Sequence, residues 1–462
     1  MKSVNEIVQN QRDFFYSDAS KSVNFRINSL KKLYDVIFQR QDEIEEALQA
    51  DLNKSGFEAY VSEVGMILDE LRYTIKHLKK WTKIKSVGTP LLHFLSRSFI
   101  ISEPFGVVLI MSPWNYPFLL TLSPLIGALA AGNCCVVKPS QYSKVTSAII
   151  GEILAQAFPQ EYVAVVQGGR EANSELLGIR FDYIFFTGSP AVGHIVMESA
   201  AKFLTPVTLE LGGKSPCIVD GTSDIELAAK RIVWGKFLNA GQTCVAPDFI
   251  IVQEELKESL EKMLLFYITK FYGEKPLENP ELPKIINGKH FQRLVSLIEG
   301  TKSSSTEKII TGGIYDPVSE KVAPTLIENV LWDSPLMKEE IFGPLLPILT
   351  FKSYDNLIQT LKSREKPLAL YIFSKDKKMQ NRLLQSLSFG GGCINDTIIH
   401  LANPKLPFGG IGNSGMGQYH GKYSFETFSH KKSIIKKSNM LDVNLRYPPF
   451  KDHLNIIRKI LK

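Results

Sequence analysis

The chain has 462 residues, 44% hydrophobic and 22% charged, a composition typical of a soluble globular protein with two or three domains. Its formal charge of +7 lies entirely in residues 431–462, which hold nine Lys or Arg against two Asp, so a basic nucleic-acid groove across the body is excluded. No apolar signal segment opens the sequence, and the most apolar stretch, 118–132, is too short to cross a bilayer. The five cysteines show neither disulfide nor zinc spacing, so we expect a cytoplasmic protein without a metal site.

The first 81 residues predict helices, because apolar side chains such as Ile27, Leu30 and Leu33 recur every three or four positions. Residues 82–103 break this pattern and end in a strand-like alternation. From Gly106 onward short apolar strands alternate with helices, which predicts parallel βαβ units and a sheet covered on both faces. The strands expected in this region are 107–111, 134–138, 163–166, 183–186 and 207–211, with a helix after Gly193. A second α/β region follows at 212–412.

Two neighbouring segments of the sequence carry groups suited to covalent catalysis. Cys244 ends a run of small and polar residues, Ala-Gly-Gln-Thr-Cys, and Glu210 opens Glu-Leu-Gly-Gly. A thiol with an ordinary pKa is only slightly ionised at neutral pH, so a nucleophilic cysteine needs a base or a cation nearby. The alternative for any single cysteine is burial in the core.

A strand-to-helix turn at 188–193 predicts a phosphate site. It follows an apolar strand and opens a helix, where free N–H groups and the helix dipole attract pyrophosphate. The spacing differs from Gly-x-Gly-x-x-Gly, and plain chain reversal is the alternative.

Six motifs, in this order along the chain, resemble the aldehyde dehydrogenase superfamily. They are MSPWNYP at 111–117, FTGSPAVG at 186–193, ELGGKSP at 210–216, GKFLNAGQTCVAP at 235–247, EEIFGP at 339–344 and LPFGGIGNSG at 406–415. The resemblance extends from Asn24 to His430 and is greatest to the class 3 type, which takes aromatic and medium-to-long-chain aldehydes.

The resemblance implies an α/β fold with a Rossmann-like dinucleotide-binding domain, a second α/β catalytic domain and a small β oligomerisation arm. The expected boundaries are 1–81 with 104–211, then 212–412, then 82–103 with 427–438, followed by a basic tail at 439–462. A homodimer built through the arm is implied.

For the cofactor, the resemblance implies NAD. The residues it assigns to cofactor binding are Lys138, Gln141, Gly188, Ser189, Pro190, Ala191, Val192, Gly193, Glu340 and Phe342. Lys138 matches the lysine that binds the adenosine ribose, and Glu340 and Phe342 match the residues that hold the nicotinamide end. The family motif Lys-Pro-Ser-Glu here ends in Gln141, so the repulsion that a carboxylate exerts on a 2′-phosphate is missing and NADP stays open.

The resemblance also implies the chemistry. Cys244 attacks the aldehyde, Asn115 and the Cys244 N–H hold the oxyanion, hydride leaves to the nicotinamide, and Glu210 activates water against the thioester. Glu340 is the alternative base. The rival functions are transfer of the acyl group to coenzyme A, which needs no hydrolytic base, and a catalytically silent structural relative.

The substrate and the C-terminal tail are the two remaining expectations. Apolar side chains flank the motifs, and no Arg or Lys is adjacent in sequence to Asn115 or Cys244, which favours an apolar aldehyde. These flanking side chains are Tyr116, Phe118, Leu119, Trp234, Phe237, Leu238, Ile398 and Ile399. Residues 451–462 predict a short basic amphipathic helix suited to peripheral membrane contact, with packing on the enzyme surface or a solvated tail as alternatives.

Overall fold

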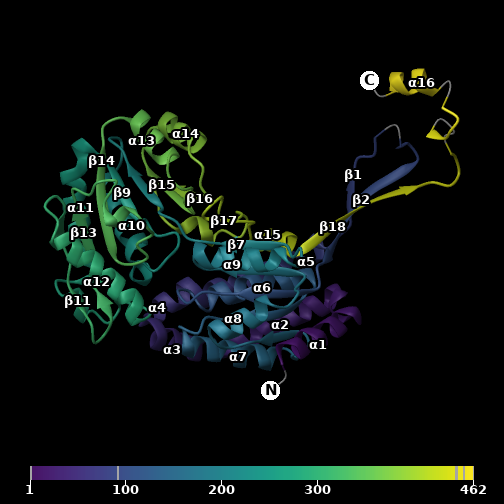
Figure 1. Ribbon diagram of the computed structural model, residues 1–462, viewed down its shortest axis with the longest axis horizontal. Coiled ribbons are helices and arrows are strands. Elements are labelled where there is room, and N and C mark those ends of the chain that lie inside the picture. Colours follow the sequence, from purple (N-terminus) through teal and green to yellow (C-terminus); the bar gives the residue numbers. More distant parts are fainter. Residues whose placement is uncertain (1–2, 91–92, 443–445, 451–452, 461–462) are drawn as a thin grey trace.

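The computed structural model describes residues 3–90, 93–442, 446–450 and 453–460. Two large sheets with their helices form the body, and a three-stranded arm extends away from it (Figure 1). Parts of the predicted arm (91–92) and tail (443–445, 451–452, 461–462) lie outside the described residues. Within the described ranges no helix is both long and apolar enough to span a bilayer.

The first sheet has six strands in the order β17-β7-β6-β3-β4-β5, all parallel except the pair β17 and β7. Their bounds are β3 (Val107–Met111), β4 (Cys134–Lys138), β5 (Val163–Val165), β6 (Tyr183–Thr187), β7 (Val207–Glu210) and β17 (Gly415–Met416). Every residue of β3, β4 and β6 is buried, as a parallel sheet covered on both faces requires.

Helices of the N-terminal half cover this sheet, with α6 packed on β3 and β4 and α9 on β6 and β7. Their bounds are α1 (Val4–Tyr16), α2 (Val23–Gln39), α3 (Gln41–Leu52), α4 (Gly56–Ala59), α5 (Gly65–Trp81), α6 (Leu119–Ala131), α7 (Lys144–Ala157), α8 (Arg170–Leu177), α9 (Pro190–Ala201) and, later in the chain, α15 (Gly421–Thr427). The chain also makes a 3₁₀ turn, η1 (Ala19–Lys21), and a π-helical turn, η2 (Tyr60–Val64). Helix α9 begins at Pro190, earlier than the sequence predicted, because proline already fits the first turn of a helix.

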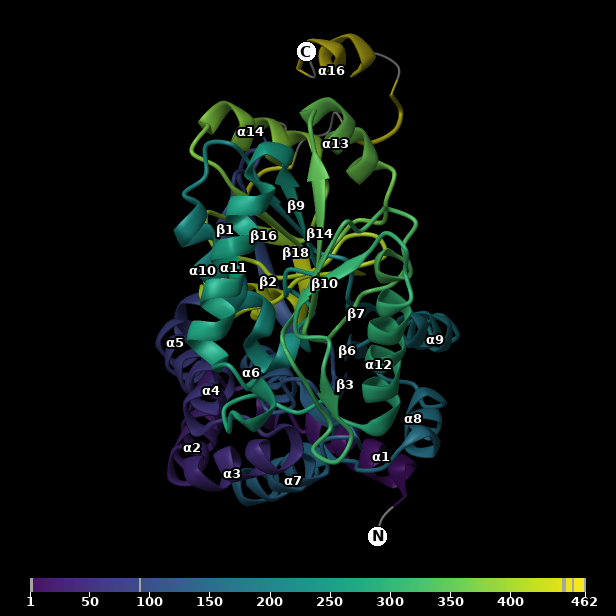
Figure 2. The ribbon, with the colours of Figure 1, turned by 90° about the vertical axis from the view of Figure 1, so that its left-hand side faces the viewer.

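The second sheet has seven strands in the order β10-β13-β14-β9-β8-β15-β16, parallel except for β10. The strands are β8 (Pro216–Val219), β9 (Phe249–Gln253), β10 (Lys308–Thr311), β13 (Thr325–Glu328), β14 (Leu345–Phe351), β15 (Ala369–Phe373) and β16 (Gly391–Ile394), beside a small pair, β11 (Tyr315–Asp316) and β12 (Lys321–Val322). Figure 2 shows α10 and α11 on one side of β9 and β14 and α12 on the other. The helices are α10 (Ile225–Phe237), α11 (Lys257–Tyr272), α12 (Gly288–Lys302), α13 (Tyr354–Lys362) and α14 (Lys377–Ser386), with short turns η4 (Leu238–Gly241), η5 (Glu254–Leu256), η6 (Pro276–Glu278), η7 (Pro335–Met337) and η8 (Ile399–Ala402).

The arm is an antiparallel sheet in the order β1-β2-β18. It consists of β1 (Lys85–Val87), β2 (Ser96–Pro104) and β18 (Ser429–Lys437). Beyond it, α16 (His453–Ile460) stands clear of the body (Figure 1).

The order in which the chain builds the strands of the first sheet indicates where this sheet binds a ligand. From β3 the chain moves outward through β4 to β5, and then returns to the other side of β3 to build β6 and β7. The carboxyl ends of β3 and β6 therefore flank a topological switch point, where open parallel sheets bind their ligands.

Candidate active site

A cleft of about 1450 Å³ lies at this switch point. Ser112 and Gly188, which directly follow β3 and β6, line it from the first sheet. Pro216 and Phe249, which begin β8 and β9, line it from the second. The carboxyl ends of one sheet thus meet the amino ends of the other across the cleft.

Most residues that the sequence assigned to a site line this cleft together. They are Asn115, Gly188, Ser189, Pro190, Ala191, Val192, Glu210, Cys244, Glu340 and Phe342. Lys138, Gln141 and Gly193 are not part of this lining. Gly193 packs on Leu211 instead, since a Cβ there would lie 2.8 Å from Leu211 Cδ2, and it allows α9 to approach β7 closely.

The loop before Cys244 has an unusual backbone. Asn239, Ala240 and Gly241 have φ values of 52°, 50° and 73°, three left-handed residues in succession. Gly241 cannot be replaced easily, because a Cβ would lie 2.3 Å from the carbonyl oxygen of Gly343. The loop turns the chain sharply out of α10 and leaves Cys244 partly exposed in the cleft.

Asn115 is tied to the cysteine loop by its side chain. The side-chain Nδ2 donates to the backbone carbonyl oxygen of Gln242 at 3.0 Å. The backbone carbonyl oxygen of Asn115 accepts from Asn239 Nδ2 at 2.7 Å. The side chain is 3% exposed, so its position is fixed by packing as well as by hydrogen bonds. One amide hydrogen of Asn115 is thereby used, and the other is available to a ligand in the cleft.

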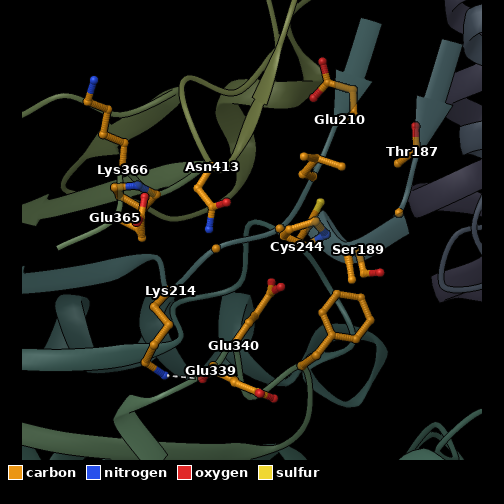
Figure 3. A pocket seen from close by; sticks show the side chains of 18 of the residues that line it. Thr187, Ser189, Glu210, Lys214, Cys244, Glu339, Glu340, Glu365, Lys366 and Asn413 are labelled. Carbon is orange, nitrogen blue, oxygen red and sulfur yellow. Dashed lines mark hydrogen bonds between the residues drawn. The ribbon is translucent and has the colours of Figure 1, made fainter. Parts of the chain in front are cut away.

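Two carboxyl groups lie near the Cys244 thiol, which appears between Glu210 and Glu340 in Figure 3. Burial raises the pKa of the thiol well above its usual range, and the charges of Glu340 and Glu210 raise it further. In the free protein at neutral pH Cys244 is therefore a thiol, and it must lose its proton before it can act as a nucleophile.

Glu210 is the last residue of β7 and is 2% exposed. Neither of its carboxyl oxygens has a hydrogen-bond partner. Burial raises its pKa well above the ordinary value. A buried carboxyl without a protein partner is costly, and such groups occur where a ligand or water completes the site.

Glu340 lies against the Gly-Gly segment that follows Glu210. A Cβ on Gly212 would lie 2.0 Å from Glu340 Oε2, so only glycine fits there. Burial raises the pKa of Glu340 to about 8, Asp248 adds to the rise, and a hydrogen bond from Gly213 opposes it. Lys214, which donates to Asp248 and to the carbonyl oxygen of Glu339 at 2.9 Å, fixes this segment. This role of Lys214 was not predicted, although the residue stands in the ELGGKSP motif.

The cleft fits a dinucleotide. Helix α9 begins at its wall, and Ser189 at the N-cap makes no side-chain capping bond. Pro190 has no N–H and the N–H of Val192 donates to the Ser189 carbonyl oxygen, so in the first turn the N–H of Ala191 is left for a phosphate. A Cβ on Gly188 would lie 2.5 Å from the Phe186 ring.

The polar groups of the lining also suit an anionic ligand. Thr187 Oγ1 is buried without a partner, and eight Lys or Arg against four Glu make the lining cationic. Phe342 has φ 46° and meets Trp114 edge-on at 5.4 Å, a strained backbone of the kind found at ligand sites.

Lys138 and Gln141 are not part of the lining, although Ser140 and Tyr142 between and beside them are. Lys138 Nζ donates to the carbonyl oxygen of Pro139 at 2.8 Å, and burial lowers its pKa to about 8. The Gln141 side chain crosses to Gly169, where a Cβ would lie 2.2 Å from Gln141 Oε1. Arg170 follows Gly169 and lines the cleft, a cation that the sequence analysis did not single out.

The eight apolar side chains that flank the motifs differ in their exposure. None of the eight lines the cleft. Phe118 and Phe237 are fully buried in the core, Tyr116 bonds Thr243 Oγ1 at 2.6 Å, and only Trp234 and Ile399 are exposed, at 42% and 50%. No Lys or Arg is adjacent to Asn115 in sequence, but the fold places one there. Lys54 Nζ donates to the backbone carbonyl oxygen of Asn115 at 3.1 Å.

Two largely parallel sheets that meet at a cleft of about 1450 Å³, with a thiol and two carboxyl groups inside it, are typical of a nucleotide-dependent enzyme. The chain belongs to the aldehyde dehydrogenase family, whose model matches residues 1–434.

The similarity to individual members extends over the whole chain. It is 47% identical to 4,4'-diaponeurosporen-aldehyde dehydrogenase of Staphylococcus aureus (strain NCTC 8325 / PS 47), over all of both chains. It is 46% identical to human aldehyde dehydrogenase family 3 member B1, covering 97% of this chain and 95% of that one. The solved substrate-bound state of Staphylococcus aureus AldH superposes with a TM-score of 0.97 at 46% identity, over the full length of both.

More distant solved members hold both nicotinamide cofactors. A betaine aldehyde dehydrogenase of Staphylococcus aureus in complex with NAD+ has 27% identity and a TM-score of 0.85, over 96% of this chain and 88% of that one. A glyceraldehyde-3-phosphate dehydrogenase of Methanocaldococcus jannaschii with NADP has 26% identity and a TM-score of 0.84, over 94% of each chain. The chain is thus an oxidoreductase that acts on aldehydes with NAD or NADP, as its motifs predicted.

The raised pKa of Glu340 predicts a pH-dependent stability. Between pH 4.5 and about 8 the unfolded chain loses the Glu340 proton while the folded protein keeps it, so this group's contribution to stability falls as pH rises. Glu340→Gln removes the titration, and the melting temperature of the variant relative to wild type should increase from pH 5 to pH 9 in thermal unfolding of the cofactor-free protein. Glu339→Gln, at the exposed neighbour, is the matched control. A constant difference for Glu340→Gln across this range would refute the assignment.

Proposed function

We propose that Cys244 is the nucleophile of this aldehyde dehydrogenase and that it oxidises the aldehyde through a covalent thioester. The thiol loses its proton to the ionised form of a neighbouring carboxyl group, for which Glu210 and Glu340 are the two candidates. The sulfur then adds to the carbonyl carbon, and the electron pair of the C=O bond moves to oxygen. A nicotinamide cofactor held by residues 188–192, Glu340 and Phe342 would supply the acceptor for the hydride that leaves this carbon.

Asn115 supplies the stabilisation of the oxygen that becomes negative. Its free amide hydrogen and the backbone N–H of Cys244 are the proposed donors, and a side-chain donor of this kind is worth roughly two to three orders of magnitude in rate. The support is the hydrogen bond from Asn115 Nδ2 to the carbonyl oxygen of Gln242. Gln242 stands two residues before Cys244, so this bond holds the amide close to the cysteine loop.

Glu210 is proposed as the base that hydrolyses the thioester. It takes a proton from water as the oxygen adds to the thioester carbon, and the C–S bond then breaks. A carboxylate whose pKa is raised by burial is a stronger base than an exposed one. Acyl transfer to coenzyme A would not need this group, and a silent relative would not retain it together with Cys244 and Asn115.

The observation that carries the proposal is the presence of Cys244, Asn115, Glu210 and Glu340 in one cleft at the ends of both sheets. In chain order these four residues are separated by 95, 34 and 96 positions, so folding brings together groups that are far apart in the sequence.

Cys244→Ala should lower aldehyde oxidation by more than about a thousandfold, because no other group can form the thioester. NADH affinity, measured by fluorescence titration, should change little. Cys134→Ala and Cys217→Ala, at cysteines buried in the two sheets, serve as matched controls and should stay active. Retention of more than a few per cent of single-turnover NADH formation by Cys244→Ala would contradict the mechanism.

The choice between NAD and NADP is proposed to depend on Gln141. Its neutral amide lies beside Gly169, next to the cleft-lining Arg170, and does not repel a 2′-phosphate as a carboxylate would. Two charges 4 Å apart in water interact by about 1 kcal/mol, or roughly fivefold in binding.

Gln141→Glu should therefore raise the ratio of kcat/KM for NAD to that for NADP by about fivefold or more. Steady-state kinetics with both cofactors measures this ratio. Gln156→Glu, on the exposed face of α7, adds the same charge away from the cleft and should leave the ratio unchanged. No change in the ratio with Gln141→Glu would place cofactor selection elsewhere.

An apolar aldehyde is the proposed substrate class. Trp234 and Ile399 expose apolar surface on adjacent segments, because a Cβ on Gly235 would lie 2.1 Å from Thr397 Oγ1. Tyr371, whose hydroxyl donates to the carbonyl oxygen of Val245, connects this region to the cysteine loop. The relative named for 4,4'-diaponeurosporen-aldehyde supports the same class. Lower kcat/KM for long-chain and aromatic aldehydes than for carboxylated semialdehydes would refute it.

A homodimer formed through the arm is also proposed. Strand β18 is an edge strand with one side unpaired, and all but its first and last residues are exposed, a surface that invites pairing with another chain. Sedimentation velocity should show a dimer; a monomer at micromolar concentration would contradict this.

For location, we propose a cytoplasmic enzyme with peripheral membrane contact. Five free cysteines suit a reducing compartment. In α16, Leu454 and Ile456 are 57% and 45% exposed, with Arg458 and Lys459 beside them. Lys451, Leu461 and Lys462, which the sequence analysis included in this helix, lie outside the described residues.

Removal of residues 451–462 should reduce co-sedimentation with anionic vesicles, and the difference should shrink in neutral lipid and at higher salt, because each cation near an anionic surface adds about 1 kcal/mol. Leu454→Ser in the full chain should give an intermediate loss. Equal partitioning of the full-length and truncated proteins into anionic vesicles would mean that this tail does not bind membranes.

A further inference from the structure

A buried ion pair lies directly behind Asn115. Lys54 and Glu63 expose no side-chain surface, and Lys54 Nζ lies 2.5 Å from Glu63 Oε1. Withdrawing two charges from water is unfavourable, and well-packed apolar residues often stabilise a core at least as well. Stability alone therefore gives no reason for an ion pair at this place.

The pair holds the segment that carries Asn115 at two points. Lys54 Nζ also donates to the carbonyl oxygen of Asn115 at 3.1 Å and lies 4.0 Å from the centre of the Tyr116 ring. The second oxygen of Glu63 accepts from the backbone N–H groups of residues 118–119 at 2.9 and 3.1 Å, where α6 begins. One ion pair thus fixes the chain at Asn115 itself and again three to four residues after it.

The same short stretch also reaches the cysteine loop. Glu58, on α4, accepts from the backbone N–H of Asn239 at 2.8 Å. Glu63 is presented by the π-helical turn η2, a rare geometry that is frequent at functional sites. Residues 54–63 therefore touch both the segment of Asn115 and the loop that precedes Cys244.

We propose that the Lys54–Glu63 ion pair is a positioning device that sets the direction in which Asn115 donates to the aldehyde oxygen. The inference rests on the proposed function, and it adds two positioning residues that do not themselves touch substrate. Lys54 and Asn239 both donate to the backbone carbonyl oxygen of Asn115, which fixes its backbone. One side-chain amide hydrogen is used by Gln242, so the amide has a single remaining donor direction.

The test uses Lys54→Met together with Glu63→Gln in the full-length enzyme. Lys54→Met alone leaves an unpaired buried carboxylate and can fail to fold, whereas the double change removes both charges and keeps an acceptor for residues 118–119. The matched control is Lys257→Met with Glu328→Gln, an ion pair of 2.6 Å between α11 and β13 whose residues do not line the cleft.

Single-turnover NADH formation per titrated Cys244 thiol should fall by about tenfold or more in the Lys54/Glu63 variant and stay unchanged in the control. The KM for aldehyde and the affinity for NADH should stay within about twofold, which a general loss of structure would not allow. In an Asn115→Ala background the same double change should cost no more than about twofold, because the group that it positions is gone.

A wild-type rate per active site, or an equally large loss in the Asn115→Ala background, would overturn the positioning role while leaving the proposed function intact. Failure of the proposed function looks different, since it would appear as NADH formation by Cys244→Ala or as its absence in the wild-type enzyme.

Discussion

The reactive thiol depends on a loop whose backbone is unfavourable by itself. Residues 239–241 are left-handed in succession, and an L-amino acid such as Ala240 adopts this conformation at a cost of about 1–2 kcal/mol. Contacts from three directions offset that cost. Asn115 reaches the loop from the first sheet, Glu58 from α4, and Gln242 extends to the backbone of residues 284–286. The loop therefore joins the two halves of the molecule at the point where Cys244 enters the cleft.

The burial that fixes this loop also sets the protonation of the site. Cys244, Glu210 and Glu340 all have raised pKa values, and burial is the largest cause for each. Glu210 in addition lacks any hydrogen-bond partner. Such groups reduce the stability of the free protein, and their concentration in one cleft is the physical mark of a site that is completed by ligands and water.

Local pattern was enough to predict some of this site. The turn at 188–193 could be identified because a glycine between an apolar strand and a helix start leaves the same signal in sequence and structure. Lys54 could not, since its contact with Asn115 spans 61 residues and only the fold brings them together. The aromatic side chains Phe118 and Phe237 misled for a related reason, because nearness to a motif in sequence does not show whether a side chain faces the cleft or the core.

Oxidation through a thioester on Cys244 that Glu210 helps to hydrolyse is tested most directly with the Glu210→Gln variant. The variant is mixed with aldehyde and NAD and quenched in acid, and its peptides are analysed by mass spectrometry. We expect a burst of NADH of about one equivalent per active site, a slow steady state, and the acyl mass on the peptide that contains Cys244. A burst without acylation of that peptide, or acylation of another residue, would contradict it.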